Sequence, residues 1–206
     1  MTPPVAGMKG PDIPGFQWVR PLGQGGFADV FLYRQELPSR EVAIKVVRMQ
    51  GDERGTKELH READAMTLLA GHPSVVELHG VGTTADGRAY LIMEYCPVAD
   101  LLTQVRARPM SLEKALDTMI KISGGVEMFH RQGYVHRDIK PSNIMLDSYG
   151  KPVLADFGVA SKVGQLEVGA FDGFSVLWAP PEQQDVNSPA SPLQDVWALA
   201  ATTWTF

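Results

Sequence analysis

Residues 136–143 read H-R-D-I-K-P-S-N and bring three different functional groups into one short segment. Asp138 supplies a carboxylate, Lys140 an ammonium group and Asn143 an amide. This trio suits the transfer of a phosphoryl group to a hydroxyl. The carboxylate orients the hydroxyl and accepts its proton, the cation neutralises charge on the moving phosphoryl group, and the amide oxygen holds a magnesium ion. An ordinary polar surface loop is the competing explanation, and it weakens with each further motif that fits the same chemistry.

A glycine-rich segment at residues 22–30, L-G-Q-G-G-F-A-D-V, offers a place for phosphates. Glycine permits tight turns, so backbone N–H groups can close over phosphate oxygens. Alone the segment is a weak signal, because the chain contains 20 glycines and a plain hairpin explains it equally well. Residues 42–45, V-A-I-K, read as a strand in which Ile44 and Lys45 point to opposite faces. Lys45 can then face a site while Ile44 packs in the core.

These segments, together with Asp156-Phe157-Gly158, resemble the signature motifs of protein kinases. H-R-D-x-K-P-x-N is similar to the catalytic loop, V-A-I-K to the strand lysine and D-F-G to the magnesium-binding motif, while Ala28 replaces the third glycine of the glycine-rich loop. The resemblance runs from about Trp18 to Phe206. It implies an α+β, protein-kinase-like two-lobe fold: an antiparallel N-lobe sheet with one main helix, then a mostly helical C-lobe that is incomplete after its central helix.

The resemblance implies a role for each matched residue. Asp138, Lys140 and Asn143 are the catalytic residues, and Asn143 and Asp156 hold Mg²⁺ or Mn²⁺. The nucleotide is ATP. Its implied contacts come from the glycine-rich loop, the lysine strand, the next helix and the link between the lobes: Leu22, Gly23, Gln24, Gly25, Gly26, Phe27, Ala28, Val30, Ala43, Lys45, Glu62, Met93, Glu94, Cys96 and Asp100.

Two of these assignments have alternatives. Glu62 is the expected partner of Lys45, because it lies near the inward face of the predicted helix. Glu58, one turn earlier, is the second choice, and Asp64 lies off that face. Asp100 stands where kinases often place an acid for the ribose hydroxyls, but capping of the helix that starts at Leu101 explains it nearly as well.

The elements that must position these residues can be read from the hydrophobic pattern. A helix is expected over residues 56–70, with Gly71 as its left-handed C′ residue. A second helix is expected between the N-cap Ser111 and Gly133, and close packing explains Gly124-Gly125 inside it. Short β-branched and aromatic runs predict strands over residues 16–20, 30–33, 42–47, 75–81, 89–93, 144–146 and 152–154.

This pattern also sets the expected domain boundaries. Residues 1–15, rich in proline and glycine, read as a disordered leader. Residues 16–93 form the kinase N-lobe, residues 94–97 the hinge and residues 98–206 a partial C-lobe. Ligands often bind where two such lobes meet.

Several positions bear on the substrate. Lys140, two residues after Asp138, resembles serine/threonine kinases, and Ser175 stands where these carry a threonine that contacts the catalytic loop. Ser142 replaces an acid that is frequent in kinases with basic substrates, so a basic consensus is not supported. Residues 178–182, W-A-P-P-E, look like the corresponding segment of bacterial, actinobacterial-like serine/threonine kinases.

The activation segment carries few hydroxyl groups that could be phosphorylated. Ser161 and Ser175 are the only ones between Asp156 and Glu182. The resemblance implies that Arg137 pairs with a phosphorylated loop. Glu167 or Asp172 could supply fixed charge instead, or they are two solvated loop acids.

The last residues resemble the start of the long central helix of the kinase C-lobe, beginning at residues 195–199, D-V-W-A-L. This helix is apolar nearly all round. It is therefore expected to be buried on every side, and to present an exposed hydrophobic patch where no other segment covers it. We therefore expect a C-terminally truncated kinase domain. The sequence leaves open the activity and stability of this segment alone, and the nature of any segment beyond Phe206.

Composition limits the kinds of partner and the cellular compartment that we expect for this chain. The net charge of −5 argues against a nucleic-acid partner. Neither a secretory leader nor an apolar run that could span a bilayer is visible, so no membrane contact is expected from this segment. The single cysteine, Cys96, fits a reducing compartment, and a cytoplasmic location is expected. The oligomeric state and the identity of the protein substrate stay open.

The expected function is that of a non-specific protein serine/threonine kinase, which transfers the γ-phosphoryl group of ATP to serine or threonine hydroxyls of proteins. The alternative is an ATP-binding pseudokinase or inactive fragment that acts as a binding module, which the presence of every catalytic group disfavours. A dinucleotide-binding Rossmann domain fails, because its glycines should open a helix, whereas a strand is expected after residues 23–26.

Overall fold

The computed structural model describes residues 8–166, 175–185 and 187–206. The chain divides into two compact units, Met1–Asp64 with Glu77–Cys96, and Ala65–Val76 with Pro97–Phe206. The boundary after Cys96 falls inside the predicted hinge. Residues 65–76, in contrast, belong to the second unit, although the sequence pattern places them in the N-lobe.

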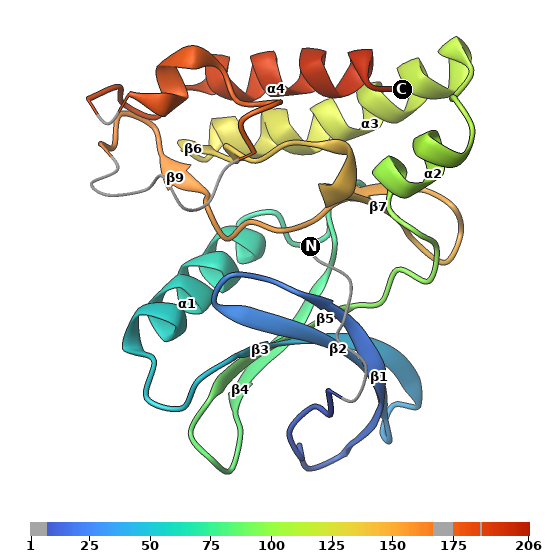
Figure 1. Ribbon diagram of the computed structural model, residues 1–206, viewed down its shortest axis with the longest axis vertical. Helices are drawn as coiled ribbons and strands as arrows, with labels where there is room; N and C mark the ends of the chain where they lie inside the picture. The colour runs from blue at the N-terminus through green and yellow to red at the C-terminus, as the bar shows by residue number, and fades with distance from the viewer. Residues whose placement is uncertain (1–7, 167–174, 186) are drawn as a thin grey trace. The chain divides into compact units, whose positions relative to one another are not determined.

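The first unit is built on a five-stranded antiparallel sheet with the order β1-β2-β3-β5-β4 (Figure 1). Its strands are β1 (Phe16–Gln24), β2 (Ala28–Gln35), β3 (Arg40–Val47), β4 (Leu78–Thr83) and β5 (Ala89–Glu94). Helix α1 (Glu53–Thr67) follows β3. The predicted strand-rich first lobe with one main helix is confirmed.

Strand β3 contributes to the apolar layers on both sides of this sheet. Val42, Ile44 and Val46 pack in one cluster with aromatic residues of β2. Val47 packs in a second cluster with Leu59 of α1. Since side chains alternate along a strand, Ile44 and its neighbour at position 45 face opposite sides, as predicted.

Helix α1 begins and ends about one turn earlier than predicted, since the sequence pattern favours residues 56–70. The carboxylate of Asp52 accepts a hydrogen bond from the N–H of Gly55 at 2.9 Å, which satisfies a donor of the first turn. The glycine in that turn conceals the helix start in the sequence. After Thr67 the chain leaves the helix, and Gly71 adopts the left-handed conformation with φ of 81°.

Residues 8–15 lie on the sheet, in contrast to the disordered leader that composition predicts. Ile13 is 1% exposed and belongs to the first apolar cluster. The hydroxyl of Tyr33 donates to the carbonyl of Pro11 at 2.6 Å. Gly10 packs so closely on the Tyr33 ring that a Cβ atom would overlap it. One buried isoleucine and one tyrosine hydroxyl therefore order a segment whose proline and glycine content suggests disorder.

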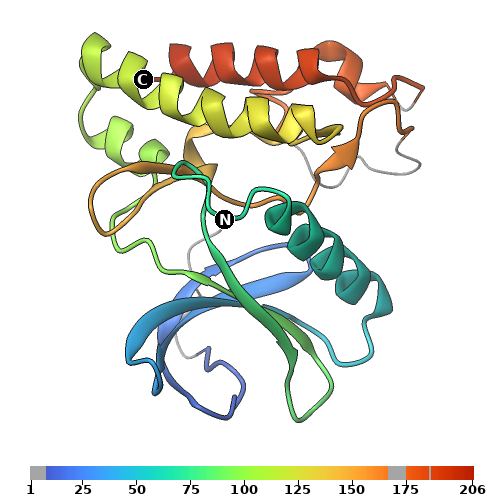
Figure 2. The same cartoon turned by 180° about the vertical axis from the view of Figure 1, so that it is seen from behind.

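The second unit is mostly helical, and Figures 1 and 2 show α4 running beside α3. Its helices are α2 (Leu101–Ala107), α3 (Leu112–Arg131) and α4 (Pro192–Trp204), with 3₁₀ turns η1 (Pro141–Asn143) and η2 (Pro181–Gln184). Its two-stranded sheets pair β6 (Tyr134–Val135) with β9 (Ser161–Lys162), and β7 (Ile144–Leu146) with β8 (Pro152–Leu154). Across the described ranges, no helix combines the length and apolar character needed to cross a bilayer.

Helix α3 has the ends that the sequence predicts. The Ser111 hydroxyl accepts a hydrogen bond from the N–H of Lys114 at 3.3 Å, and Gly133 follows the helix with φ of 79°. The predicted apolar stripe is buried at Ala115, Met119, Ile122, Val126 and Phe129, whereas Leu112 and Leu116 are exposed.

The glycine pair in α3 allows close packing, as expected. A Cβ atom on Gly125 would lie 3.1 Å from Cγ2 of Val75 and 3.4 Å from Nδ1 of His72. The same stretch is hydrogen-bonded to β8, since the N–H of Leu154 donates to the carbonyl of Ser74 at 2.8 Å. These contacts explain why residues 65–76 belong to the second unit.

Helix α4 leaves its apolar side exposed, as expected where cover is missing, and the face that it buries is largely polar, which was not predicted. Its buried side chains are Gln194, Asp195, Ala198 and Thr202. Trp197 and Trp204, in contrast, are 52% and 93% exposed. Asp195 and Thr202 of this face make hydrogen bonds to residues 136–139, and the apolar face is left toward solvent within the described chain.

Candidate active site

The backbone before Asp138 is anchored by α4 and by the turn that precedes it. Asp195, which is fully buried, accepts hydrogen bonds from the N–H groups of His136 at 2.8 Å and Arg137 at 2.7 Å. Gln183 Nε2 donates to the carbonyl of Arg137 at 2.7 Å. Arg137 has φ of 68°, a conformation that a non-glycine residue keeps only when its surroundings hold it. These contacts fix the backbone next to Asp138 and so the direction in which its side chain projects.

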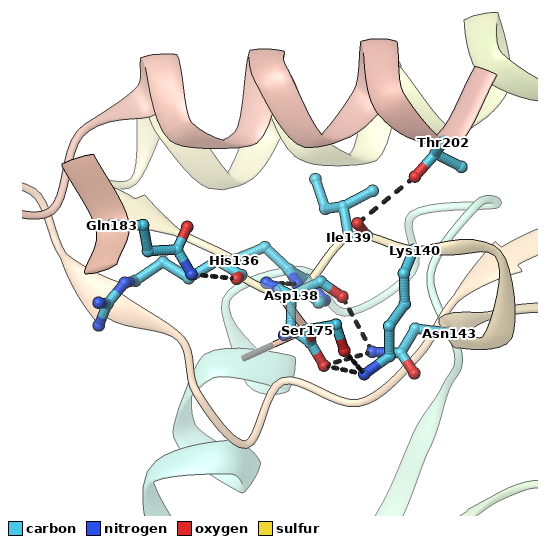
Figure 3. A network of polar contacts seen from close by, with 9 residues as sticks. His136, Asp138, Ile139, Lys140, Asn143, Ser175, Gln183 and Thr202 are labelled. Atoms are coloured by element: carbon cyan, nitrogen blue, oxygen red, sulfur yellow. Dashed lines mark hydrogen bonds and ion pairs between the residues drawn. The ribbon is translucent and has the colours of Figure 1, made fainter. Parts of the chain in front are cut away.

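Three donors converge on the Asp138 carboxylate (Figure 3). Lys140 Nζ lies 2.6 Å from Oδ2, Asn143 Nδ2 lies 3.0 Å from the same oxygen, and the N–H of Ser175 lies 3.2 Å from Oδ1. Lys140 Nζ also donates to the Ser175 hydroxyl at 2.7 Å. The predicted trio is therefore one network, and the predicted contact of Ser175 with the catalytic loop is confirmed. Charge-assisted hydrogen bonds of this kind hold a carboxylate in one orientation.

The proposed metal ligands Asn143 and Asp156 come from adjacent pieces of backbone. The N–H of Ala155 donates to the carbonyl of Asn143 at 2.9 Å, and Asp156 has φ of 64°. Since Asn143 Nδ2 donates to the Asp138 carboxylate, its amide oxygen points away from that group. Amide and carboxylate oxygens suit a hard divalent cation. Within the described ranges, no three His, Cys, Asp or Glu side chains are arranged so that they could hold a metal ion.

His136 packs under this loop. It is fully buried, and its ring centroid lies 4.7 Å from that of Phe157. Its Nδ1 accepts a hydrogen bond from the N–H of Asp138 at 3.3 Å. Burial lowers the pKa of His136, because the charged imidazolium would lose its hydration. The negative charge of Asp195 raises this pKa, but by less than burial lowers it.

In the first unit, Lys45 and Glu62 form the predicted ion pair. Lys45 Nζ lies 2.8 Å and 2.7 Å from the two carboxylate oxygens of Glu62, whose side chain is 3% exposed. Glu58 instead pairs with Arg54 at 3.1 Å, and Asp64 is exposed. The structure thus selects Glu62 from the three acids that the helix offers. Its buried carboxylate fixes the direction of the ammonium group.

The glycine-rich segment forms the turn between β1 and β2, and residues 22–30 all lie in this hairpin. Gly23 pairs with Val30 across the strands, and the N–H of Gly25 donates to the carbonyl of Ala28 at 2.9 Å. A strand follows the glycines, as expected, and this excludes the Rossmann arrangement.

The residues predicted to border the adenine lie at the end of β5 and just beyond it. Met93 pairs with Ala43 of β3. The N–H of Glu94 donates to the carbonyl of Glu77 at 2.9 Å, so this donor is engaged within the first unit. Cys96 is partly buried. A contact between the adenine base and this stretch would therefore use a group other than the N–H of Glu94.

Asp100 is the N-cap of α2. Its Oδ1 accepts a hydrogen bond from the N–H of Thr103 and its Oδ2 accepts one from the Thr103 hydroxyl, both at 3.0 Å. The capping interpretation of Asp100 is confirmed. Ribose binding by the same carboxylate stays a prediction.

Arg137 donates to the Ser161 hydroxyl at 3.3 Å. Glu167 and Asp172, which could supply fixed charge to this arginine, lie outside the described residues.

Two residues that hold the catalytic loop are assigned no role by the sequence patterns. Asp195 is the only acid in α4, and a carboxylate in a first helical turn is ordinarily explained by the helix dipole. Its position in an apolar helix is the one signal that it serves another element. Gln183 carries no such signal, since a glutamine in a short turn is unremarkable in a sequence.

The motifs and the geometry together define a family. A buried lysine–glutamate pair, a glycine-rich hairpin and a hydrogen-bonded H-R-D loop with a neighbouring D-F-G segment are features of protein kinases. The protein kinase domain family matches residues 16–206. The chain belongs to this family.

Its relatives include bacterial serine/threonine kinases. The chain is 38% identical over 201 residues to the serine/threonine-protein kinase PknK of Mycobacterium tuberculosis, covering 93% of this chain and 18% of that protein. It is 32% identical over 189 residues to the serine/threonine-protein kinase PrkC of Bacillus subtilis, covering 89% and 29%. It is 30% identical over 190 residues to the probable serine/threonine-protein kinase PknB of Lactococcus lactis, covering 89% and 30%. The chain spans less than a third of the length of these relatives, and the predicted likeness to bacterial kinases is confirmed.

Proposed function

We propose that this chain is the catalytic part of a protein serine/threonine kinase, which transfers the γ-phosphoryl group of ATP to serine or threonine hydroxyls of proteins. The observation that carries the proposal is the Asp138 carboxylate, held by Lys140, Asn143 and Ser175. A fixed carboxylate beside a fixed cation is what transfer to a hydroxyl requires.

Each residue of the network then has a role. Asp138 orients the substrate hydroxyl and accepts its proton, and Lys140 steadies the phosphoryl group as it moves. Asn143 and Asp156 would hold Mg²⁺ or Mn²⁺, which neutralises charge on the phosphates when it is bound. Lys45, directed by Glu62, binds the nucleotide phosphates.

The remaining nucleotide contacts are proposed from the family motifs. Residues 22–30 cover the phosphates with backbone N–H groups, and Ala43 and Met93 border the adenine. Backbone groups of residues 94–96 bind the base, and Asp100 is the candidate for the ribose hydroxyls.

Three further observations support the proposed substrate class and compartment. The contact of Lys140 with the Ser175 hydroxyl at 2.7 Å supports a serine/threonine kinase, since the sequence resemblance implies a contact between these two segments in that class. The names of the relatives support protein substrates. We place the reaction in the cytoplasm, because the single cysteine of the sequence fits a reducing compartment.

The proposal is tested by Asp138→Asn in the full-length protein. The amide cannot accept the hydroxyl proton, so kcat for transfer from radiolabelled ATP to a protein substrate should fall by roughly 10²–10⁴-fold. The dissociation constant of Mg·ATP, measured by calorimetry, should change by less than about twofold, because Asp138 is proposed to act on the hydroxyl and not on the nucleotide.

Asp117→Asn is the matched control. Asp117 is an exposed acid of α3 whose partner is Lys121, at 2.6 Å on the same helix. This variant should retain full turnover. Equal turnover of Asp138→Asn and the unaltered protein would refute the proposed role of Asp138. Binding of Mg·ATP without any transfer by the unaltered protein would favour the pseudokinase.

A further inference from the structure

An arginine outside the kinase motifs holds the glycine-rich turn. Arg48 directly follows β3, and its N–H donates to the carbonyl of Phe27 at 2.9 Å. Its guanidinium Nη2 lies 2.9 Å from Oδ1 of Asp29, and Nε lies 3.3 Å from both carboxylate oxygens. Nη2 also donates to the carbonyl oxygen of Gly25. Arg48 therefore links the start of the turn to the strand that leaves it.

The two partners of this pair differ in burial. The Asp29 side chain is 10% exposed, and that of Arg48 is 44% exposed. The hydrogen bond that the Arg48 guanidinium donates to Asp29 raises the pKa of Arg48. A guanidinium fork on a mostly buried carboxylate holds its geometry better than two solvated side chains do. The positive charge nevertheless stays open to solvent on one side.

These contacts hold Gly25, and glycine is the residue type with the greatest backbone freedom. Both backbone polar groups of Gly25 are engaged, because its N–H donates to Ala28 and its carbonyl accepts from Arg48. Glycine has the largest conformational freedom to lose when a turn becomes ordered. A turn that is already ordered in the free protein has less entropy to lose when it closes over phosphates.

A second cation lies close to the same turn. The guanidinium carbon of Arg54 lies 5.0 Å from the centre of the Phe27 ring. Arg54 is also paired with Glu58 at 3.1 Å, as Arg48 is with Asp29, so the two guanidinium groups pack and hydrogen-bond beside the turn and add little net charge to it.

We propose that Arg48 is a positioning residue for the nucleotide: with Asp29 it pre-forms the glycine-rich turn in the shape that covers ATP phosphates. This inference rests on the proposed kinase function. Arg48 acts through the shape of the turn, and it takes no part in the transfer step. Its loss should therefore weaken ATP binding and leave kcat nearly unchanged.

The test measures the Kd of Mg·ATP by calorimetry, together with KM for ATP and kcat, in the full-length protein. Arg48→Met keeps the apolar stem and removes the guanidinium, so Kd and KM for ATP should rise roughly three- to tenfold, the size of effect expected for the loss of one ordinary hydrogen bond. Arg48→Lys keeps the charge without the fork and should give a smaller rise. Arg34→Met is the matched control, because Arg34 is an exposed arginine toward the far end of β2 and should leave Kd unchanged.

Two further measurements separate the turn from general stability. Arg48→Met leaves the Asp29 carboxylate without this partner and can lower the melting temperature, whereas the double variant Asp29→Asn/Arg48→Met removes both charges. If the two residues act as a unit, the double variant should bind Mg·ATP no more weakly than Arg48→Met alone. Hydrogen exchange at the N–H of Gly25 should become faster in both variants without nucleotide.

The outcomes are distinct. A folded Arg48→Met protein that binds Mg·ATP as tightly as Arg34→Met, or more tightly, would overturn the role of Arg48 while leaving the proposed kinase function intact. Additive effects of Asp29→Asn and Arg48→Met on Kd would overturn the pairing. An unaltered protein that binds no Mg·ATP would overturn the proposed function, and the inference with it.

Discussion

Arg137 and Asp156 share an unusual backbone conformation, with φ of 68° and 64°. Within the described chain they are the non-glycine residues with positive φ. Such a conformation costs of order 1–3 kcal/mol, and it persists where surrounding contacts fix it. Asp195 and Gln183 supply those contacts for Arg137 through its N–H and carbonyl groups. Among the described residues, positive φ outside glycine thus occurs in the two segments that carry the proposed chemistry.

The buried histidine of the catalytic loop makes stability depend on pH. The pKa of His136 is lowered by burial from its ordinary value of 6.5. Below that pH the unfolded chain binds a proton that the folded chain does not, so the free energy of unfolding falls as the pH drops. Above it the ring is neutral in both states and the contribution is constant. The slope is at most about 1.4 kcal/mol per pH unit.

His136→Asn should reduce this dependence, because asparagine does not titrate in the same range and keeps an acceptor near the position of Nδ1. The measurement is urea unfolding of both proteins between about pH 7 and about pH 5, where the other histidines contribute equally to each. A smaller slope is expected for the variant. Identical slopes would show that His136 keeps its ordinary pKa in the folded protein.

At the scale of secondary-structure elements, the ends of the helices determine where several side chains lie. The capping residues Ser111 and Asp100 start α3 and α2, and the carboxylate of Asp195 reaches from the first turn of α4 to the catalytic loop. Both oxygens of Asp100 are engaged in capping, at 3.0 Å each. An oxygen that caps a helix is a weaker candidate for a ribose contact, because it would have to be shared.

Asp100→Ala should therefore act on stability. Loss of the cap is expected to lower the free energy of unfolding by about 1 kcal/mol, and Asp100→Ser should recover most of it, since serine is also a good N-cap. Denaturant unfolding gives this comparison, and KM for ATP measured on the same variants tests the ribose role. If the carboxylate binds ribose, Asp100→Ser will raise KM for ATP even though the helix is capped.

Across the whole molecule, the sequence predicts what depends on local pattern. The Lys45–Glu62 pair, the Ser111 cap and the β7–β8 hairpin follow from motif and periodicity, and each is present. The predicted strand over 75–81 appears only from Leu78, because Val75 and its neighbours bond to β8 of the second unit, a contact between distant parts of the chain.

Other features could not be predicted for the same reason. The order in residues 8–15 depends on Tyr33 and on the apolar cluster of the sheet, and composition does not contain that information. Part of the buried polar face of α4 depends on the catalytic loop, because the N–H groups of His136 and Arg137 find their acceptor in Asp195. Packing between distant segments decides both cases.

The most direct test of the central claim is a structure of the protein with Mg²⁺ and a non-hydrolysable ATP analogue. We expect the cation within about 2.0–2.1 Å of the amide oxygen of Asn143 and of a carboxylate oxygen of Asp156. We also expect the Asp138 carboxylate to face the same cavity, still bonded to Lys140. A cation bound elsewhere, or Asp138 and Asp156 turned away from a common cavity, would contradict the account.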